Sequence, residues 1–412
     1  MRRIQQPSFC LSRRQLLALP LAAALVPASV AAAAENLYWT PSVRFVGPPA
    51  DWRTQFPSTS LLLQDGTHEQ ALVQRLRDAA VAVLADRTDL RFLPETVAAQ
   101  GDDHHVLSFA LDGEEVESQW VDGRLAVSYE LQALVLLLNL SRDPNRQRVV
   151  GSYPVRVRYL DMPASGQPPS PDQRLAVFRQ MLLEPAIGMP SLVHEWARQA
   201  AKLSMRNRDK FVRVKTLQLT DAARQSLANA GAKATDVNAL AQRATSMLEA
   251  GLVKAFNIPI IPDSGELAAG VLLLTTANGT VGPSFAFAAP DHSLELTLRD
   301  VRHLRQPGSG GRVGEAFGAA FAARYLKEEP DGTSKPLLQA SLRRVDMVFH
   351  MGDRQLQPAP QFSRVVANFS HELTQNLAAP NLEWLTLSKS DAEAQSPSDL
   401  QRAFQSVSKS LR

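Results

Sequence analysis

The sequence predicts an α+β fold with two or more domains, in which antiparallel or mixed sheets are packed by amphipathic helices. Three observations lead to this prediction. Apolar residues recur at intervals of three and four in some segments and alternate in others, so both helices and strands are expected. The composition is that of a globular protein, with 45% hydrophobic and 21% charged residues. The length of 412 residues exceeds that of most single domains.

The first 34 residues have the layout of a cleavable signal peptide. Four arginines come before any acidic residue, and the apolar stretch Leu16–Val26 is interrupted by Pro20. A spanning helix needs about 20 uninterrupted apolar residues, so we expect no permanent membrane span after cleavage. Small side chains at Ala32 and Ala34 predict cleavage after Ala34. The remainder would carry 40 basic and 41 acidic residues, a balance that gives no indication of nucleic-acid binding.

The arginine pair lies in the segment Ser12-Arg13-Arg14-Gln15-Leu16-Leu17. This segment resembles the twin-arginine (Tat) export signal, in which two large apolar residues, here Leu16 and Leu17, follow the pair. The resemblance covers the leader only. It implies a bacterial protein delivered to the periplasm by the Tat export machinery. An ordinary secretory signal that contains two arginines is one alternative, and an uncleaved anchor is another.

The single cysteine, Cys10, lies inside this leader. The chain after cleavage would contain no cysteine. Disulfides, thiolate metal sites and a cysteine nucleophile are therefore excluded for the exported form.

An N-terminal α+β domain is predicted over residues 35–163. A helix should run from Thr67 to about Arg87, with Thr67 and Gln70 spaced as a capping box. The strand "LRFLP" should follow it. Residues 126–160 alternate in hydrophobicity and predict an antiparallel hairpin, whose wet face carries Arg156 and Arg158. These two arginines are either solvated or bind an anion.

A segment rich in proline, serine and glycine, "MPASGQPPSPD", marks a boundary. Residues 164–206 are then predicted to form a helical hairpin or connector. Its first helix begins after the cap Ser170, with Pro171 at the first helical position and Gln173 three residues after the cap. Its second helix begins at about Ser191.

A C-terminal α+β domain is predicted over residues 207–412. A long helix should follow the cap at Thr235, and a last helix should follow the cap at Ser396. Between them the alternating segments "SLELTLRD" and "LLQASLRRVDMVFHM" predict strands, and "FSRVVANFSHELTQNL" predicts a helix. We also expect "NLEWLTLS" to be a strand.

Three segments share one pattern, in which a helix ends and a short apolar strand follows within a few residues. They are "RDAAVAVLADRTDLRFLPE", "LVKAFNIPIIPDS" and "HELTQNLAAPNLEWLTLS". The spacing resembles small α/β domains of bacterial envelope proteins, such as the amino-terminal domain of TolB-like proteins or the CsgG-like fold. The resemblance covers about 25 residues each time and implies an internal repeat.

The glycine-rich loop "QPGSGGRVG" lies between a predicted strand and a predicted helix. That context favours a backbone cradle for phosphate, so Gly308, Gly310, Gly311 and Gly314 are candidate cofactor-binding residues. The polar segment before the loop does not look like a buried Rossmann strand, and a flexible connector is the alternative. No cofactor is named by the sequence.

Four residues form the best metal-ligating candidate in the chain: Asp102, Asp103, His104 and His105. Carboxylates and imidazoles ligate divalent metals. Neighbouring histidines on a strand point to opposite faces, however, so they cannot chelate one ion together without a bend. A solvated strand entry is the alternative.

No catalytic spacing is recognisable, so the catalytic residues are unknown and an enzyme is less expected than a binding protein. We expect an exported periplasmic or envelope-associated protein that acts by binding or scaffolding, with envelope proteins as partners. One alternative is a Tat-exported enzyme whose cofactor or metal site is built from distant residues. Another is a scaffold that pairs through open sheet edges.

Overall fold

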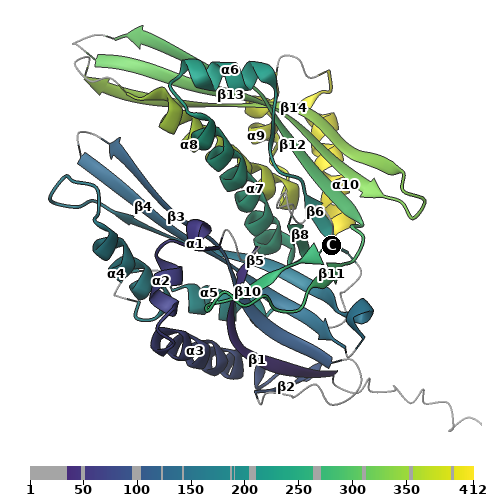
Figure 1. Ribbon diagram of the computed structural model, residues 1–412. Helices are drawn as coiled ribbons and strands as arrows, with labels where there is room; N and C mark the ends of the chain where they lie inside the picture. The colour runs from purple at the N-terminus through teal and green to yellow at the C-terminus, as the bar shows by residue number, and fades with distance from the viewer. Residues whose placement is uncertain are drawn as a thin grey trace, which may run out of the picture. The chain divides into compact units, whose positions relative to one another are not determined.

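The computed structural model describes residues 35–47, 52–94, 104–121, 124–141, 143–185, 188–189, 191–203, 210–262, 271–308, 312–351, 356–390 and 394–412. Within these residues the chain forms ten α-helices and two mixed sheets. The α+β class predicted from the sequence is therefore confirmed. Residues 35–412 pack as one unit, shown in Figure 1.

The first sheet is built mainly from residues 35–161. Its central strands lie in the order β2-β1-β3-β4-β5; β1 is parallel to β2 and β3, and β3, β4 and β5 are antiparallel neighbours. The strands are β1 (Glu35–Val46), β2 (Leu90–Leu93), β3 (His104–Val121), β4 (Arg124–Leu140) and β5 (Arg148–Asp161). The hairpin predicted over 126–160 is confirmed as β4 and β5, joined across the 3-10 turn Pro144–Arg146.

Helices cover one face of this sheet. They are α1 (Trp52–Gln55), α2 (Thr59–Leu63), α3 (Thr67–Leu84), α4 (Pro171–Leu182) and α5 (Leu192–Ala200). Helix α5 packs on β4, β5 and α3, and its Trp196 ring lies edge-on to Trp39 and Phe109 in the core. The capping box at Ser170 is confirmed, because its hydroxyl and the Gln173 side chain bond reciprocally to the backbone. The box predicted at Thr67 is wrong, because the cap position is Gly66.

The second sheet repeats the topology of the first. Its strands lie in the order β8-β6-β12-β13-β14; β6 is parallel to β8 and β12, and the last three strands are antiparallel. They are β6 (Val212–Val214), β8 (Ile260–Pro262), β12 (His292–Pro307), β13 (Arg312–Glu328) and β14 (Ser334–Met351), with the short β7 (Gln218–Leu219) beside β12. In both halves the chain thus forms a strand, then helices, then a second strand parallel to the first, and then a three-stranded antiparallel meander.

The remaining helices belong to this second half. They are α6 (Asp221–Asn229), α7 (Ala234–Phe256), α8 (Pro358–Ala378), α9 (Leu382–Ser388) and α10 (Pro397–Leu411). Two of the three predicted helix–strand units are confirmed as α3–β2 and α7–β8. The third is wrong, because "NLEWLTLS" forms α9, which Asn381 caps. The long helix begins at Ala234, after the cap position Lys233 rather than at Thr235.

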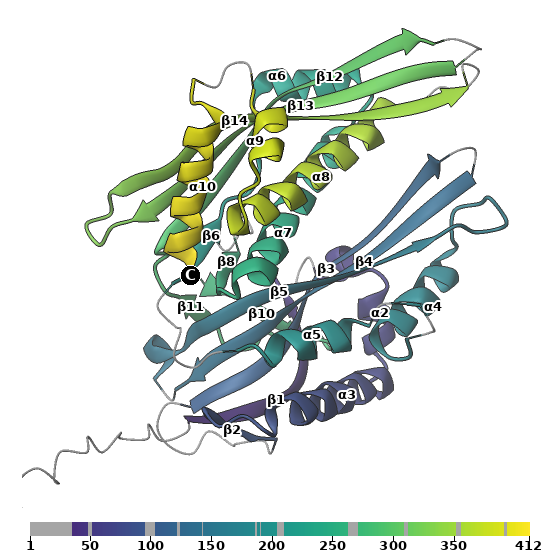
Figure 2. The same cartoon turned by 180° about the vertical axis from the view of Figure 1, so that it is seen from behind.

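Helices α7 and α8 lie between the two sheets, as Figures 1 and 2 both show. Helix α8 packs on β13 and β14, whereas α7 contacts β5 of the first sheet. The two helices approach closely at Gly251, where an added Cβ would lie 2.4 Å from the Thr374 Oγ1. Because threonine is stiff at χ1, only glycine permits this packing without a shift of one helix.

A crossover segment, residues 271–287, runs from the second half back to the first sheet. It contains β9 (Val271–Leu272), β10 (Leu274–Thr276) and β11 (Phe285–Phe287). Strand β10 pairs antiparallel with β1, and β11 pairs parallel with β5. The segment therefore closes both edges of the sheet, and its Leu272, Leu274 and Phe285 bury the apolar outer side of β4.

Candidate functional site

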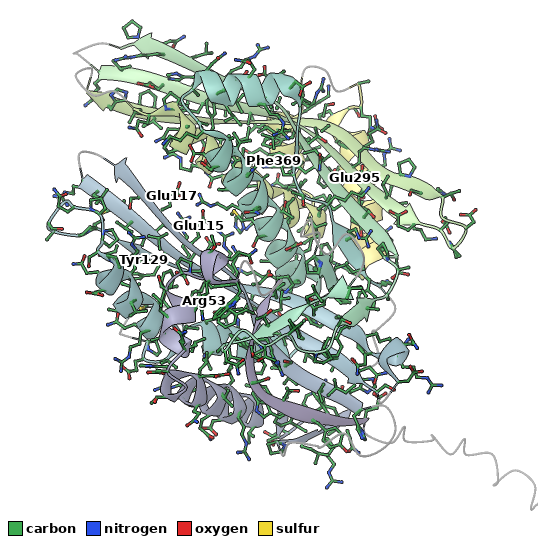
Figure 3. All side chains as sticks on the ribbon, in the orientation of Figure 1. Arg53, Glu115, Glu117, Tyr129, Glu295 and Phe369 are labelled. Carbon is green, nitrogen blue, oxygen red and sulfur yellow. The ribbon has the colours of Figure 1, made fainter. Side chains whose placement is uncertain are left out.

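A charged cleft of about 210 Å³ lies between strands β3, β4 and β5 of the first sheet and the helices α7 and α8. Figure 3 shows Glu115 and Glu117 on the side of β3 that faces α7. The cleft is lined by polar side chains of both halves, among them Glu115, Glu117, Ser128, Glu130, Arg156, Arg158, Arg243, Ser363, Arg364 and Asn368.

Arg243 of α7 is the main link across this cleft. Its guanidinium donates to Glu117 at 2.7 Å and to Glu115 through two nitrogens, one of them at 3.0 Å. Burial alone would lower the pKa of Arg243, but the hydrogen bond and charge of Glu115, together with Glu117 and Glu130, raise it above the ordinary value. The arginine is therefore fixed as a cation that three carboxylates surround.

Further contacts line the same cleft, and the one made by Ser246 crosses between the halves. Arg156 forms an ion pair with Glu130, and the Ser246 hydroxyl of α7 donates to the Gln132 side chain at 2.5 Å. Arg158 donates to the Ser128 hydroxyl at 2.6 Å. The prediction that Arg156 and Arg158 share one face of the hairpin is confirmed. Arg156 is half-buried in the cleft, whereas Arg158, which also lines it, is exposed. Small-molecule sites usually enclose about 300–1,000 Å³, so we interpret this smaller, charge-compensated cleft as a junction between the halves.

Asp112 lies at a bulge of β3, between Leu111 and Gly113. Burial raises the pKa of Asp112 to about 6. The folded pKa is then above the unfolded one, so the fold favours the protonated acid. The stabilising contribution is complete below about pH 4 and is lost as the pH rises through 6.

Asp112→Asn is accordingly expected to stabilise the protein by about 1–3 kcal/mol at pH 7, because it removes the desolvation cost of a half-buried carboxylate. The gain should vanish near pH 4. Urea unfolding at pH 4 and pH 7 measures both values. The exposed Asp86→Asn is the matched control and should show no such difference. An equal effect of Asp112→Asn at the two pH values would contradict the prediction.

An exposed apolar patch lies on the outer face of the second sheet, the face turned away from α8. Large side chains on β12 and β14 form it, and small residues of β13 lie between them. Leu304 is 64% exposed and Phe349 is 67% exposed. We define the apolar patch as Leu304, Gly314, Ala316, Gly318, Val345, Met347 and Phe349.

A buried carboxylate fixes the strands beneath the patch. The Glu315 side chain on the inner face of β13 accepts from His303 of β12 at 2.6 Å and from His350 of β14 at 2.7 Å. Arg305 Nε lies 3.8 Å from the same carboxylate. All three strands are thus tied together where the patch is most exposed, so its surface is pre-organised.

The predicted leader residues, from Ser12 to Leu17 together with Ala32 and Ala34, lie outside the described residues, as do Asp102 and Asp103. His104 and His105 begin β3. The His104 ring packs edge-on against Tyr38, and His105 lies 3.6 Å from Glu35. Among the described residues no group of three or more His, Cys, Asp or Glu side chains is placed to hold a metal ion.

The helix predicted after the glycine-rich loop is wrong. Gly314 lies in strand β13, Gly308 follows the end of β12, and Gly310 and Gly311 lie outside the described residues. The loop therefore joins two antiparallel strands. A phosphate cradle of the predicted kind depends on a helix N-terminus, which this hairpin does not provide. Cofactor binding by these glycines stays a prediction, and no helix N-terminus supports it.

The sequence did not single out the junction or the patch. Glu115 and Arg243 are 128 positions apart, so no local sequence pattern could predict their pairing. The patch did have a local signal, because Val345, Met347 and Phe349 alternate with polar or half-buried residues. We expected only a strand there, since which face a sheet exposes depends on where helices pack.

No helix in the described part of the chain is long and apolar enough to cross a membrane. No family model and no curated protein matches the chain. Among solved structures, a minor lipoprotein from Acinetobacter baumannii is similar at 11% identity over 45% of this chain and 97% of that chain, with a TM-score of 0.21. A lipopolysaccharide binding protein is similar at 8% identity over 75% and 87%, with a TM-score of 0.10.

Proposed function

We propose that this protein is exported to the periplasm by a twin-arginine leader and acts at the cell envelope by binding or scaffolding. The apolar patch is the observation that carries the binding part of the proposal. Soluble monomers rarely leave a contiguous apolar surface open to water, and such surfaces mark interaction sites. The leader pattern around Arg13 and Arg14 supports the export part.

One further feature of the architecture supports a scaffold role. The ion pairs of Arg243 and the crossover segment join the two halves. A joined pair of sheets holds the patch at a fixed place relative to the first half. The helix–strand units α3–β2 and α7–β8 fit the proposal that this chain is related to the small α/β domains of envelope assembly proteins, of the TolB-like or CsgG-like kind.

Cell fractionation tests this function. In a Gram-negative host with a twin-arginine system, the wild-type chain is expected as a processed form that sediments with the envelope. Arg13→Lys with Arg14→Lys should leave full-length precursor in the cytoplasm. Phe349→Asp should be processed normally but move to the soluble periplasmic fraction, because it places a charge in the binding surface.

Two matched variants complete the experiment. Arg2→Lys with Arg3→Lys changes two arginines of the same leader outside the motif and should leave export unchanged. Leu61→Asp changes a leucine of α2 that is also 64% exposed and should leave envelope association unchanged. Normal export of the Arg13, Arg14 variant refutes the twin-arginine route. Envelope association that is indifferent to Phe349→Asp refutes binding through the patch.

A further inference from the structure

The outer face of the second sheet is organised in cross-strand rows. Strand pairing places three residues in each row, one from each of β12, β13 and β14. Every row has a small central residue, and the flanking side chains on β14 are large and apolar. From the hairpin end inward the rows are Gln306–Gly314–Phe349, Leu304–Ala316–Met347 and Arg302–Gly318–Val345.

Cations border the apolar patch at both ends. Arg312 precedes the first row on β13, and Arg302 and Arg343 lie at the inner end. None of the three rows contains an acidic residue, and in the next row inward Asp300 of β12 pairs with Arg302 at 3.0 Å. The Arg302 side chain is still 83% exposed. On the opposite face, Glu315 is buried and hydrogen-bonded to two histidines, and Asp346 pairs with Arg344. The surface is therefore apolar in the middle and positive at its rim.

We propose that this face docks on an anionic lipid surface, with Leu304, Met347 and Phe349 entering the boundary between headgroups and acyl chains. The arginines at the rim would then contact lipid phosphates. This inference rests on the proposed envelope function and names the class of its partner. Apolar insertion and cationic attraction are the two terms that hold proteins on anionic bilayers, and this face supplies both.

The chemistry of the face favours a lipid surface over a protein partner. Small residues lie along β13, so the larger apolar side chains of β12 and β14 stand out on either side of it. Protein interfaces take their specificity from pockets filled by anchor side chains and from paired polar groups. Apart from Arg302, the three rows offer one polar side chain, the amide of Gln306. Binding to a bilayer requires no fixed pairing of individual contacts. The positive charge at the rim, to which Arg302, Arg312 and Arg343 contribute, complements lipid phosphates.

Vesicle co-sedimentation of the purified chain lacking residues 1–34 tests the proposal. Vesicles of phosphatidylethanolamine with phosphatidylglycerol supply the anionic surface, and phosphatidylcholine vesicles supply the neutral one. The wild type should bind the anionic vesicles, less at high salt, and bind the neutral ones weakly. Leu304→Asp and Phe349→Asp should each lower the partition coefficient about tenfold or more. Arg302→Gln with Arg343→Gln should lower it about fivefold per charge removed.

Leu61→Asp is the matched control, because it makes the same substitution at a leucine of the same exposure, and its partition should equal that of the wild type. Circular dichroism melts confirm that each variant is folded. Absent binding to anionic vesicles, equal binding to neutral vesicles, or binding unaffected by the patch variants each overturns the lipid proposal. If cell fractionation still depends on Phe349 in that case, the partner is a protein and the envelope function stands. If fractionation is also indifferent, the envelope function falls with it.

Discussion

Arg243→Met is expected to destabilise the protein by about 3 kcal/mol at neutral pH. The arginine side chain is only 15% exposed and holds Glu115 and Glu117 in ion pairs. Removal of one partner from a buried or half-buried pair leaves uncompensated charge, which costs about 3–5 kcal/mol in well-buried cases. We place the value at the lower end because the two glutamates are partly exposed. Urea unfolding at neutral pH measures it.

Arg364→Met is the matched control. Arg364 lines the same cleft, but its side chain is 42% exposed and its nearest carboxylate, on Asp346, is 3.8 Å away. Exposed pairs contribute less than about 1 kcal/mol, so this variant should change stability little. Adding Glu115→Gln and Glu117→Gln to Arg243→Met should restore most of the loss, because the orphaned charges are removed. Equal costs for Arg243→Met and Arg364→Met would show that the junction does not depend on the buried arginine.

Phe369→Ala is expected to cost about 3–5 kcal/mol, the range for deleting a buried aromatic ring. Phe369 of α8 is fully buried. Its ring stacks on Phe321 of β13 with centroids 3.8 Å apart and lies 6.3 Å from the Trp384 ring of α9. The substitution leaves a cavity where α8, α9 and the second sheet meet. Denaturant unfolding with an unchanged slope is the expected result.

Phe349→Ala removes the same ring from a surface position. Phe349 is 67% exposed, and surface substitutions usually change stability by less than about 0.5 kcal/mol. The difference between the two variants therefore isolates the packing contribution. A similar cost at both positions would mean that the apolar patch is covered within the chain, which would contradict its assignment as a binding surface.

Local signals were enough to predict most of the helices and most of the meander strands, but not β13. The Ser170 and Ser396 caps and the alternation in residues 126–160 act within a few residues, and tertiary packing agrees with them. The failures are also physical. Gly314, Gly318 and Ala322 are spaced by four, which suits one face of a helix, but four is also a multiple of the strand period of two. Here they line one face of β13.

The functional surfaces were less predictable than the elements that carry them. "NLEWLTLS" alternates like a strand, yet Asn381 caps it as a helix of seven residues against α10. The junction joins β3 to a helix more than a hundred positions later, and the crossover segment joins β10 to β1. Such pairings depend on the topology of the whole chain, which no window of sequence encodes. The repeated unit was visible only as two short helix–strand patterns.

The crossover segment has a consequence for the order in which the chain can fold. The Thr275 hydroxyl donates to the Gly47 carbonyl across 228 positions. The pairing of β1 with β10 can therefore form only after residues much later in the chain have been synthesised. Until β10 and β11 arrive, a growing chain presents two unpaired strand edges and an uncovered apolar sheet face, both of which promote aggregation. Contacts of such long sequence separation slow folding. The first half is therefore expected to mature late, together with the second, so that a nascent chain interrupted before residue 287 would be a substrate for chaperones rather than a folded domain.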